Sequence, residues 1–451
     1  MQDFKHINRR RPIWPFNRGK RQVNRRLTTV VELDAVLDES PRKKRSLRII
    51  LPLLALLLAA YPVAGLLQKG VAELSQSTQT QAVAAPEPVG PLSTWQSFQW
   101  SAQALSTASI TGEQLLATRA DGSRITYGFD QELQTKVHDF LASYKVPYGV
   151  FIAMEPKTGR VLAMTSFSAD NPNWDQQAYY QVYPMASLFK IITAAAALEQ
   201  KKVTPHTVVE FRGRLASENP RYWTPGKKRN NQMGLDMAMG KSVNPVFGRL
   251  ANDYVGKDSL VAYTERFGFN QPLFPGTPVQ PSQAGTPQTP EDVMLMGAGL
   301  GRDVKLSPFH AAAITAAVAN QGVMMAPLLA SEITNKTGEK IFTATPQELR
   351  RIVSQETASQ LATMMATTVQ SGTSRRAFHD RRGRQMLGRL SIAAKTGSIN
   401  GTDPAGHYSW FAAYAPIEDP KIALVSLVVN HDKWKIKASA VGEKALETFF
   451  R

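Results

Sequence analysis

Apolar residues gather into one long uninterrupted run near the amino terminus and into shorter periodic segments along the rest of the chain. The long run covers residues 49–67, which are 19 positions without a charged side chain. That length is enough to cross a bilayer as a helix, at about 1.5 Å per residue. Basic clusters precede the run, and no Lys or Arg lies between Lys69 and Arg119. Because positive flanks stay in the cytoplasm, the pattern predicts a single-pass signal anchor with a cytoplasmic amino terminus and an exported remainder.

Two other interpretations of this run compete with an anchor. A cleaved signal peptide would use the small-x-small pattern at residues 82–84, but that pattern lies well past the apolar run. The 48-residue leader is also too long for a signal peptide. A buried core helix is disfavoured by the length of the run and by its abrupt basic flank.

The shorter segments predict an alternation of hairpins and helices. In two pairs of apolar segments, the loop that joins the two segments is too short for a crossover helix, so the two strands of each pair are antiparallel. A further hairpin turns at Asp121-Gly122. The predicted strands are 116–119 with 124–127, 150–154 with 160–164, and 409–416 with 421–430. The predicted helices are 131–144, 435–450 and a segment opened by Ser307 and Pro308 and closed by Gly322.

The segment 187–199 is rich in strong helix formers, and its nearest proline is Pro184 upstream, so a helix beginning at Ser187 is predicted. Ser187 and Lys190 are then neighbours on one face. Apolar surroundings would lower the pKa of Lys190 until its neutral amine accepts the serine proton. A buried Ala-rich helix whose lysine extends to solvent explains the same residues. Taken alone the segment favours that second interpretation, because short motifs match by chance.

Charge and composition divide the chain. The absence of cysteine excludes disulfides, thiolate metal sites and cysteine nucleophiles. Residues 1–48 hold 14 Lys+Arg and 5 Asp+Glu, a charge of +9 out of the total of +17. They predict a disordered basic tail. Contact with anionic lipid is a simpler explanation of its charge than binding of nucleic acid. Residues 68–126 are predicted to be a linker and a small amino-terminal segment, and 127–451 remain for one large domain.

Two further short motifs carry hydroxyl, amide and amine groups. Ser242 and Asn244 are two residues apart on a predicted loop, where they can relay a proton and hold an amide. A capping serine beside a turn asparagine would look the same. Lys395, Thr396, Gly397 and Ser398 follow an apolar strand, so the strand end places a cation, hydroxyls and bare backbone at a cleft. The tripeptide Lys-Thr-Gly also occurs in two predicted hairpin turns, at residues 157–159 and 336–338.

Ser-x-x-Lys, Ser-x-Asn and Lys-Thr-Gly in this order are the motif set of penicillin-recognising serine enzymes. From about residue 127 to 450, the chain resembles the transpeptidase domain of penicillin-binding proteins. The glycine-rich run 297–301 and the segment 410–414 belong to this resemblance. It implies an α/β fold of α+β type, with an antiparallel sheet flanked by helices and an all-helical subdomain. It also implies a bacterial protein of the cytoplasmic membrane whose catalytic domain lies outside.

The resemblance implies a role for each motif residue. Ser187 would attack the D-Ala-D-Ala carbonyl of a peptidoglycan stem peptide or a β-lactam, and Lys190 would take its proton. Ser242 and Asn244 would pass a proton to the leaving amine and hold the substrate amide, while Lys395 would attract the terminal carboxylate. The backbone N–H groups of the first and third motif serines would form the oxyanion hole. The resemblance further implies substrate-binding roles for Thr396, Gly397 and Ser398. None of this requires a metal or a cofactor.

Several functions remain open within this resemblance. D,D-carboxypeptidase and β-lactamase activity use the same residues with water as the acceptor. A β-lactam sensor or a structural member of a cell-wall complex would be acylated without turnover. About 120 residues separate the apolar run from Ser187, which leaves no room for a glycosyltransferase domain. We therefore expect a short, monofunctional, membrane-anchored D,D-transpeptidase with stem peptides and cell-wall synthesis proteins as partners, and without nucleic acid.

Overall fold

The structure, a computed structural model, describes residues 91–451. The basic tail, the apolar run 49–67 and residues 68–90 lie outside this part, so the anchor and the domain divisions at residues 48 and 67 stay predictions. The division at residue 126 also stays a prediction. Within 91–451, no helix is both long enough and apolar enough to span a bilayer.

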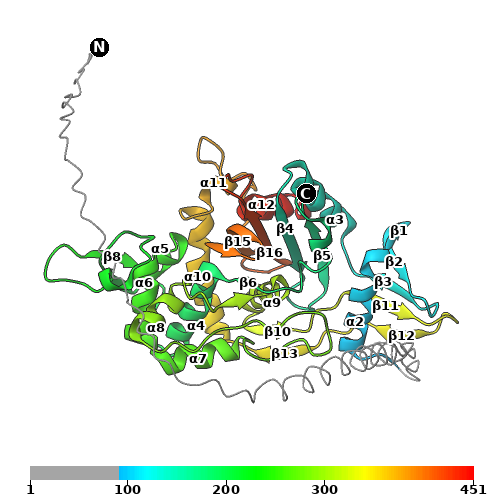
Figure 1. The fold of residues 1–451 in the computed structure, drawn as a ribbon, viewed down its shortest axis with the longest axis horizontal. Helices are drawn as coiled ribbons and strands as arrows, with labels where there is room; N and C mark the ends of the chain where they lie inside the picture. Colours follow the sequence, from blue (N-terminus) through cyan, green and yellow to red (C-terminus); the bar gives the residue numbers. More distant parts are fainter. Residues whose placement is uncertain (1–90) are drawn as a thin grey trace, which may run out of the picture. The chain divides into compact units, whose positions relative to one another are not determined.

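A central antiparallel sheet of five strands organises the domain (Figure 1). Across the sheet the strands are β14 (Ala393–Thr402), β15 (Ala405–Ala415), β16 (Ile422–Asn430), β4 (Tyr148–Met154) and β5 (Val161–Phe167). Each neighbouring pair is antiparallel, which confirms the predicted pairing of 150–154 with 160–164 and of 409–416 with 421–430.

Alternate side chains of these strands enter two cores, because successive residues of a strand point to opposite faces. Val150 and Ile152 of β4 belong to one core, and Phe151 and Ala153 belong to the other. One face is covered by α9 (Pro308–Ala319), and the other by α3 (Gln131–Ser143) and α12 (Ala438–Phe449). These helices confirm the three that the sequence predicts. A fully buried side chain of this kind contributes about 1.5–3 kcal/mol, so both faces stabilise the sheet.

A mainly helical subdomain lies between β5 and β14 in the chain. Its helices are α4 (Lys190–Glu199), α5 (Leu235–Gly240), α6 (Asn244–Arg249), the π-helical η5 (Leu250–Val255), α7 (Lys257–Arg266), α8 (Pro290–Gly297) and α10 (Gln355–Gln370). Glu199, at the end of α4, accepts hydrogen bonds from Ser354 N at 2.7 Å and from Thr357 Oγ1 at 2.8 Å. These bonds tie α4 to the start of α10, which also packs against β14.

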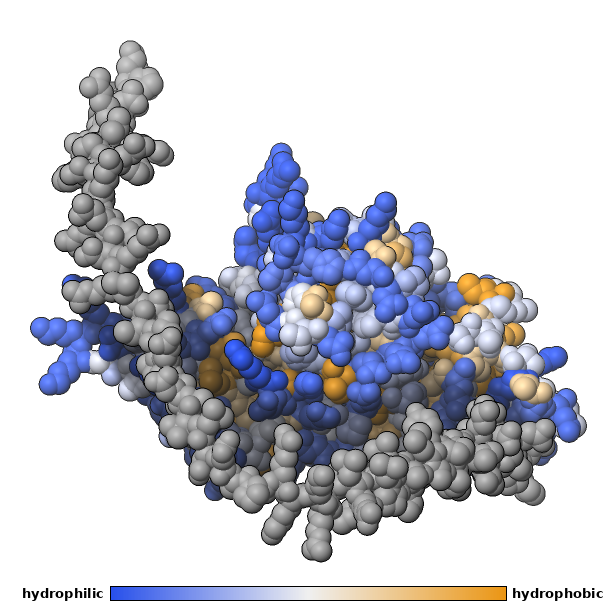
Figure 2. Space-filling model, in the orientation of Figure 1, coloured by the Kyte–Doolittle hydropathy of each residue, from blue (hydrophilic) through white to orange (hydrophobic). Residues whose placement is uncertain are grey.

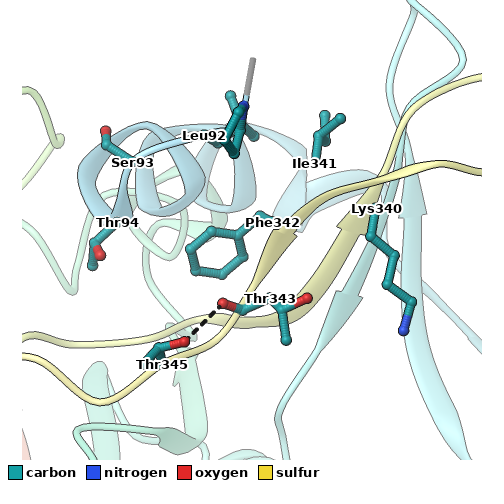
Figure 3. Close-up of a pocket in the computed structure, with 9 residues that line it drawn as sticks. Leu92, Ser93, Thr94, Lys340, Ile341, Phe342, Thr343 and Thr345 are labelled. Carbon is teal, nitrogen blue, oxygen red and sulfur yellow. Dashed lines mark hydrogen bonds between the residues drawn. The ribbon is translucent and has the colours of Figure 1, made fainter.

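A second sheet of five strands forms from two distant parts of the chain. Its order is β1 (Ser109–Thr111), β2 (Gln114–Thr118), β3 (Arg124–Tyr127), β11 (Ala330–Thr334) and β12 (Lys340–Thr343). The hairpin predicted around Asp121-Gly122 joins β2 to β3. A hollow of about 400 Å³ lies between β12 and the start of α2 (Thr94–Ala104), as Figure 3 shows. Its one charged side chain, Lys340, pairs with Glu332, so we assign this hollow no part in the chemistry.

Short strand pairs and turns complete the described residues. The pairs are β6 (Tyr183–Pro184) with β9 (Lys305–Leu306), β7 (Val208–Phe211) with β8 (Asn231–Gly234), and β10 (Val323–Met325) with β13 (Glu348–Arg351). The short helices are η1 (Leu105–Thr107), η2 (Pro172–Trp174), η3 (Ala186–Phe189), η4 (Pro220–Tyr222) and α11 (Arg375–Phe378). Antiparallel sheets with helices on their faces confirm the α+β fold.

Candidate active site

Ser187 lies on the 3₁₀ turn η3, and Lys190 is the first residue of α4. The predicted helix therefore begins at Lys190 and not at Ser187. In a 3₁₀ turn, side chains three residues apart eclipse one another. Lys190 Nζ accordingly lies 2.8 Å from Ser187 Oγ. Ser187 is 9% exposed and Lys190 is fully buried, so the hydroxyl is at the surface of the pair and the amine is beneath it.

Two other oxygen atoms surround the Lys190 amine. Asn244 Oδ1 lies 2.8 Å from Nζ, and the main-chain carbonyl of Ala298 is a further acceptor. Asn244 Nδ2 donates to the carbonyl of Ser217 at 3.3 Å, which fixes the orientation of the amide. Both partners can therefore only accept from Lys190. The sequence indicates Asn244 but gives no sign of the Ala298 carbonyl, because every residue has one.

Burial lowers the pKa of Lys190 well below its ordinary value, and the nearby Lys395 charge lowers it further. Desolvation disfavours the ammonium, and a second cation adds repulsion. A neutral amine has two N–H groups and one lone pair. In that form its two N–H groups can donate to Asn244 Oδ1 and the Ala298 carbonyl, which leaves the lone pair for the Ser187 hydroxyl. This is the geometry of a serine beside its general base.

Lys395 and Ser242 form the second contact of the site. Lys395 Nζ donates to Ser242 Oγ at 2.8 Å and to the Thr396 carbonyl at 2.7 Å. Burial lowers the pKa of Lys395 to about 7. Lys395 does not end its strand, as the sequence suggested, because β14 continues to Thr402 in register with β15. The third motif is therefore in the middle of an edge strand of the central sheet.

The first and third motifs are in direct contact. A Cβ atom added to Gly397 would lie 3.2 Å from Cβ of Ala186, so glycine here lets β14 approach the residue before Ser187. Trp410 of β15 donates its Nε1 proton to the carbonyl of Pro184 at 2.8 Å. The other two Lys-Thr-Gly tripeptides lie in turns between strands, and Lys157 pairs with Asp419 instead. Of the three tripeptides, the one at 395–397 contacts Ser242 and lies beside the turn that carries Ser187.

The hydroxyl groups of the third motif differ in their partners. Thr396 Oγ1 lies 2.6 Å from Thr373 Oγ1, whereas Ser398 is exposed and makes no side-chain hydrogen bond within the described part of the chain. Thr373 N in turn donates to the carbonyl of Gly240 at 2.9 Å. Sequence reasoning missed Thr373. Its one local signal is Gly372, which follows the helix α10 and packs on Gly240.

Gly299 supports the backbone at the nucleophile. It has φ +73°, and an added Cβ would lie 2.3 Å from the Ala186 carbonyl oxygen and 2.8 Å from Ser187 Cα. Ala186 itself has φ +53°, a conformation that costs a non-glycine residue roughly 1–2 kcal/mol. Close packing of Gly299 on this strained turn therefore holds Ser187 in place.

We expect Gly299→Ala to lower the free energy of unfolding by about 2–4 kcal/mol, because strain at positive φ adds to a clash with main-chain atoms. The matched control is Gly338→Ala, which has φ +86° but no atom within 4 Å of the added Cβ. In that control the free energy of unfolding should fall by only about 1 kcal/mol. Urea unfolding of both variants measures the difference, and equal losses would contradict the packing role of Gly299.

Comparison with known proteins identifies the family. The model of the "Penicillin binding protein transpeptidase domain" matches residues 149–448. "Peptidoglycan D,D-transpeptidase PbpA" of Mycolicibacterium smegmatis is 31% identical over a 316-residue alignment that covers 62% of this chain and 61% of the relative. "Stage V sporulation protein D" of Bacillus subtilis is 27% identical over 69% of this chain and 50% of its own length. The chain thus spans about three fifths or less of these curated relatives.

Solved structures agree with this match. The crystal structure of PBPA from Mycobacterium tuberculosis has a TM-score of 0.61 at 25% identity, covering 73% of this chain and 83% of that chain. A ceftriaxone acyl-enzyme complex of penicillin-binding protein A from the same organism has a TM-score of 0.59 at 26% identity, covering 73% and 80%. The family model spans well over half of the chain, and this protein therefore belongs to the penicillin-binding protein transpeptidase domain family.

Proposed function

We propose that this protein is a serine D,D-transpeptidase that cross-links peptidoglycan stem peptides through an acyl-enzyme on Ser187. The observation that carries the proposal is the environment of Lys190. Its Nζ lies 2.8 Å from Ser187 Oγ, 2.8 Å from Asn244 Oδ1 and within hydrogen-bond distance of the Ala298 carbonyl. Once neutral, the amine donates its two protons to the last two oxygen atoms, which can only accept, and its lone pair is left for the Ser187 hydroxyl. Similarity to proteins named peptidoglycan D,D-transpeptidase supports the substrate class.

The first half of the reaction forms the acyl-enzyme. Ser187 Oγ attacks the carbonyl carbon of the penultimate D-Ala while its proton moves to Lys190. The bond from that carbon to the terminal D-Ala nitrogen then breaks. Ser242 Oγ accepts a hydrogen bond from Lys395, so its own O–H is free to donate a proton to the leaving amine. Lys190 loses its proton through the same group, which restores the neutral base for the second half.

Lys395 would supply the charge that positions the substrate. The terminal carboxylate of the leaving D-Ala, or the carboxylate of a β-lactam, needs a cation and hydroxyl donors. Lys395 is the buried cation, and Thr396 and Ser398 carry the hydroxyls on the same strand. Gly397 lets this strand lie close to Ala186 at the nucleophile turn, and β14 is an edge strand along which a peptide can lie. The acceptor amine of a second stem peptide then attacks the acyl-enzyme, and Ser187 recovers its proton.

Incubation of the purified protein with a stem pentapeptide and an amine acceptor tests the proposal. A transpeptidase releases D-alanine and forms the cross-linked product, both of which mass spectrometry detects. Release of D-alanine without the cross-linked product would replace the proposal with carboxypeptidase activity. Acylation by a β-lactam without turnover of either substrate would replace it with a sensor or structural role.

The acylation rate should depend on pH because of the two lysines. Lys190 acts as a neutral base, so the rate falls as pH drops below its lowered pKa and the ammonium forms. Lys395 acts as a cation, so kcat/KM for a carboxylate-bearing β-lactam falls as pH rises above about 7, where Lys395 loses its proton. Stopped-flow acylation between pH 5 and 9, over the range in which the fold persists, measures both limbs. A rate that still rises above pH 8 would contradict the assigned role of Lys395.

We propose further that residues 49–67 anchor the protein in the bacterial cytoplasmic membrane, with residues 1–48 in the cytoplasm. The uncharged run and its basic flank support this topology. Fractionation of cells, followed by protease treatment of spheroplasts, tests it. Digestion of the catalytic domain in intact spheroplasts is the expected result, and protection of that domain would reverse the orientation.

A further inference from the structure

Two loops beside the site carry an unusual concentration of positive charge. Arm one is residues 212–230, between β7 and β8, and arm two is residues 372–391, between α10 and β14. In Figure 1 the green loop at β8 and the brown loop at α11 both project from the domain, and the corresponding projections are strongly hydrophilic in Figure 2. Each arm holds six Lys+Arg and one Asp or Glu.

The arms account for all of the net charge of the described residues. Together they carry +10, whereas residues 91–451 as a whole carry 38 Lys+Arg and 29 Asp+Glu, a net charge of +9. The remainder of the domain is therefore close to neutral, at −1. Ten of the twelve arm cations are arginines, compared with nine of the other 26. Arginine binds carboxylates through two parallel hydrogen bonds, so the arms are suited to a polyanion that carries carboxylates.

These cations are exposed, and all but one of them have no acidic partner in the described part of the chain. Of the twelve, Arg384 alone has a carboxylate within 4.0 Å, that of Asp380. All twelve side chains belong to exposed residues: Arg212, Arg214, Arg221, Lys227, Lys228, Arg229, Arg375, Arg376, Arg381, Arg382, Arg384 and Arg389. Unpaired charges of one sign on exposed loops concentrate an oppositely charged ligand at the surface.

Both arms are hydrogen-bonded to the candidate site. Arm one contacts the second motif, and arm two contacts the third. Asn244 donates its main-chain proton to the Leu215 carbonyl of arm one at 2.9 Å, and its Nδ2 donates to the carbonyl of Ser217. Thr373 of arm two contacts Thr396. A ligand that lies on both arms therefore passes over the site.

We propose that the two arms bind the un-cross-linked peptidoglycan polymer through carboxylates of stem peptides that are not being acylated. This inference rests on the proposed function. The exposed apolar side chains of Tyr222 (62%) and Met386 (49%) give each arm a surface for sugar rings or aliphatic groups. An anionic membrane is the competing partner. A bilayer seated on both arms would block the site, whereas the polymer delivers its own stem peptide to it.

Pelleting of the full-length protein with insoluble peptidoglycan sacculi tests the arms. One variant carries Arg214→Gln, Lys227→Gln and Lys228→Gln, and another carries Arg381→Gln, Arg382→Gln and Arg389→Gln. The control removes the same charge from exposed lysines elsewhere: Lys136→Gln, Lys145→Gln and Lys336→Gln. Residues 1–48 are unchanged in all variants, so any binding of sacculi by these residues is the same in each. The thermal unfolding midpoint checks that each variant is folded.

Each arm variant should bind sacculi about tenfold more weakly than the control at low ionic strength. The difference should shrink at 1 M salt, because the Debye length falls to about 3 Å. Equal binding by the arm variants and the control would overturn the inference. Weaker binding to phosphatidylglycerol vesicles with unchanged sacculus binding would also overturn it, in favour of a membrane surface. Fluorescent-penicillin labelling of the wild type reports separately on the proposed function, since it does not depend on the sacculus result.

Discussion

Ser187→Ala is expected to abolish covalent labelling by fluorescent penicillin and to stop cross-linking of stem peptides. The substitution removes the one oxygen atom that lies 2.8 Å from Lys190 Nζ and can form an ester. Loss of a serine nucleophile typically costs about 10⁶-fold in kcat, which is below detection in a gel assay. Fluorescence of the denatured protein band, after a short and a long incubation, measures the effect.

The fold should tolerate this change, because Ser187 is small and its hydroxyl is at the surface of the site. An unfolding midpoint within a few degrees of wild type would show that lost labelling is a chemical effect. Ser398→Ala is the matched control, since it removes a hydroxyl from the third motif and should slow acylation without preventing it. Persistent labelling of the Ser187→Ala protein would place the nucleophile elsewhere and end the proposed mechanism.

Local patterns were sufficient for most of the fold. The hairpins at β2–β3, β4–β5 and β15–β16 were predictable because apolar strands and short turns adjoin in the chain. The second five-stranded sheet was not, because β11 joins β3 across about 200 residues. The length of β14 was also missed. Its second half, 398–402, is polar or glycine apart from Ile399, and pairing with β15 makes it a strand.

The side-chain chemistry of the site was predictable, and its main-chain chemistry was not. Ser187, Lys190, Asn244, Ser242 and Lys395 all belong to short motifs whose order carries the information. The Ala298 carbonyl acts through its position alone, and position depends on the close approach of α8 to η3. The glycine-rich run 297–301 is the sequence feature that permits this close approach. It indicates tight packing without saying which carbonyl reaches the amine.

The electrostatic state of the two lysines also needed the fold. A lysine three residues after a serine is compatible with either a base or a solvated cation, and local apolar neighbours do not decide between them. Complete burial excludes a solvated cation at Lys190 and at Lys395 and lowers the pKa of both amines, and their partners then distinguish them. The site then contains two amines of different role. One has its protons held by obligate acceptors beside a hydroxyl, and the other lies on an edge strand where an anion can approach.

Lys190→Met is the variant that separates the base from the rest of the site, and we expect it to slow acylation about 10²–10⁴-fold. Methionine has a similar length and no lone pair of comparable basicity, so Ser187 stays in place without a proton acceptor. The change leaves Asn244 Oδ1 and the Ala298 carbonyl without a donor, at about 1–3 kcal/mol each, but it also removes a desolvated amine. The unfolding midpoint should therefore change little.

Stopped-flow acylation by a fluorescent penicillin measures the rate of this variant as a function of pH. The acid limb assigned to Lys190 should disappear along with the rate, because the group that titrates is gone. Lys157→Met is the control: that lysine belongs to another Lys-Thr-Gly turn, pairs with Asp419 at 2.9 Å and is 64% exposed, so its loss should leave the rate unchanged. Acylation of Lys190→Met at the wild-type rate would show that Ser187 loses its proton to another base. The lone pair inferred from the three contacts of Lys190 would then have no catalytic role.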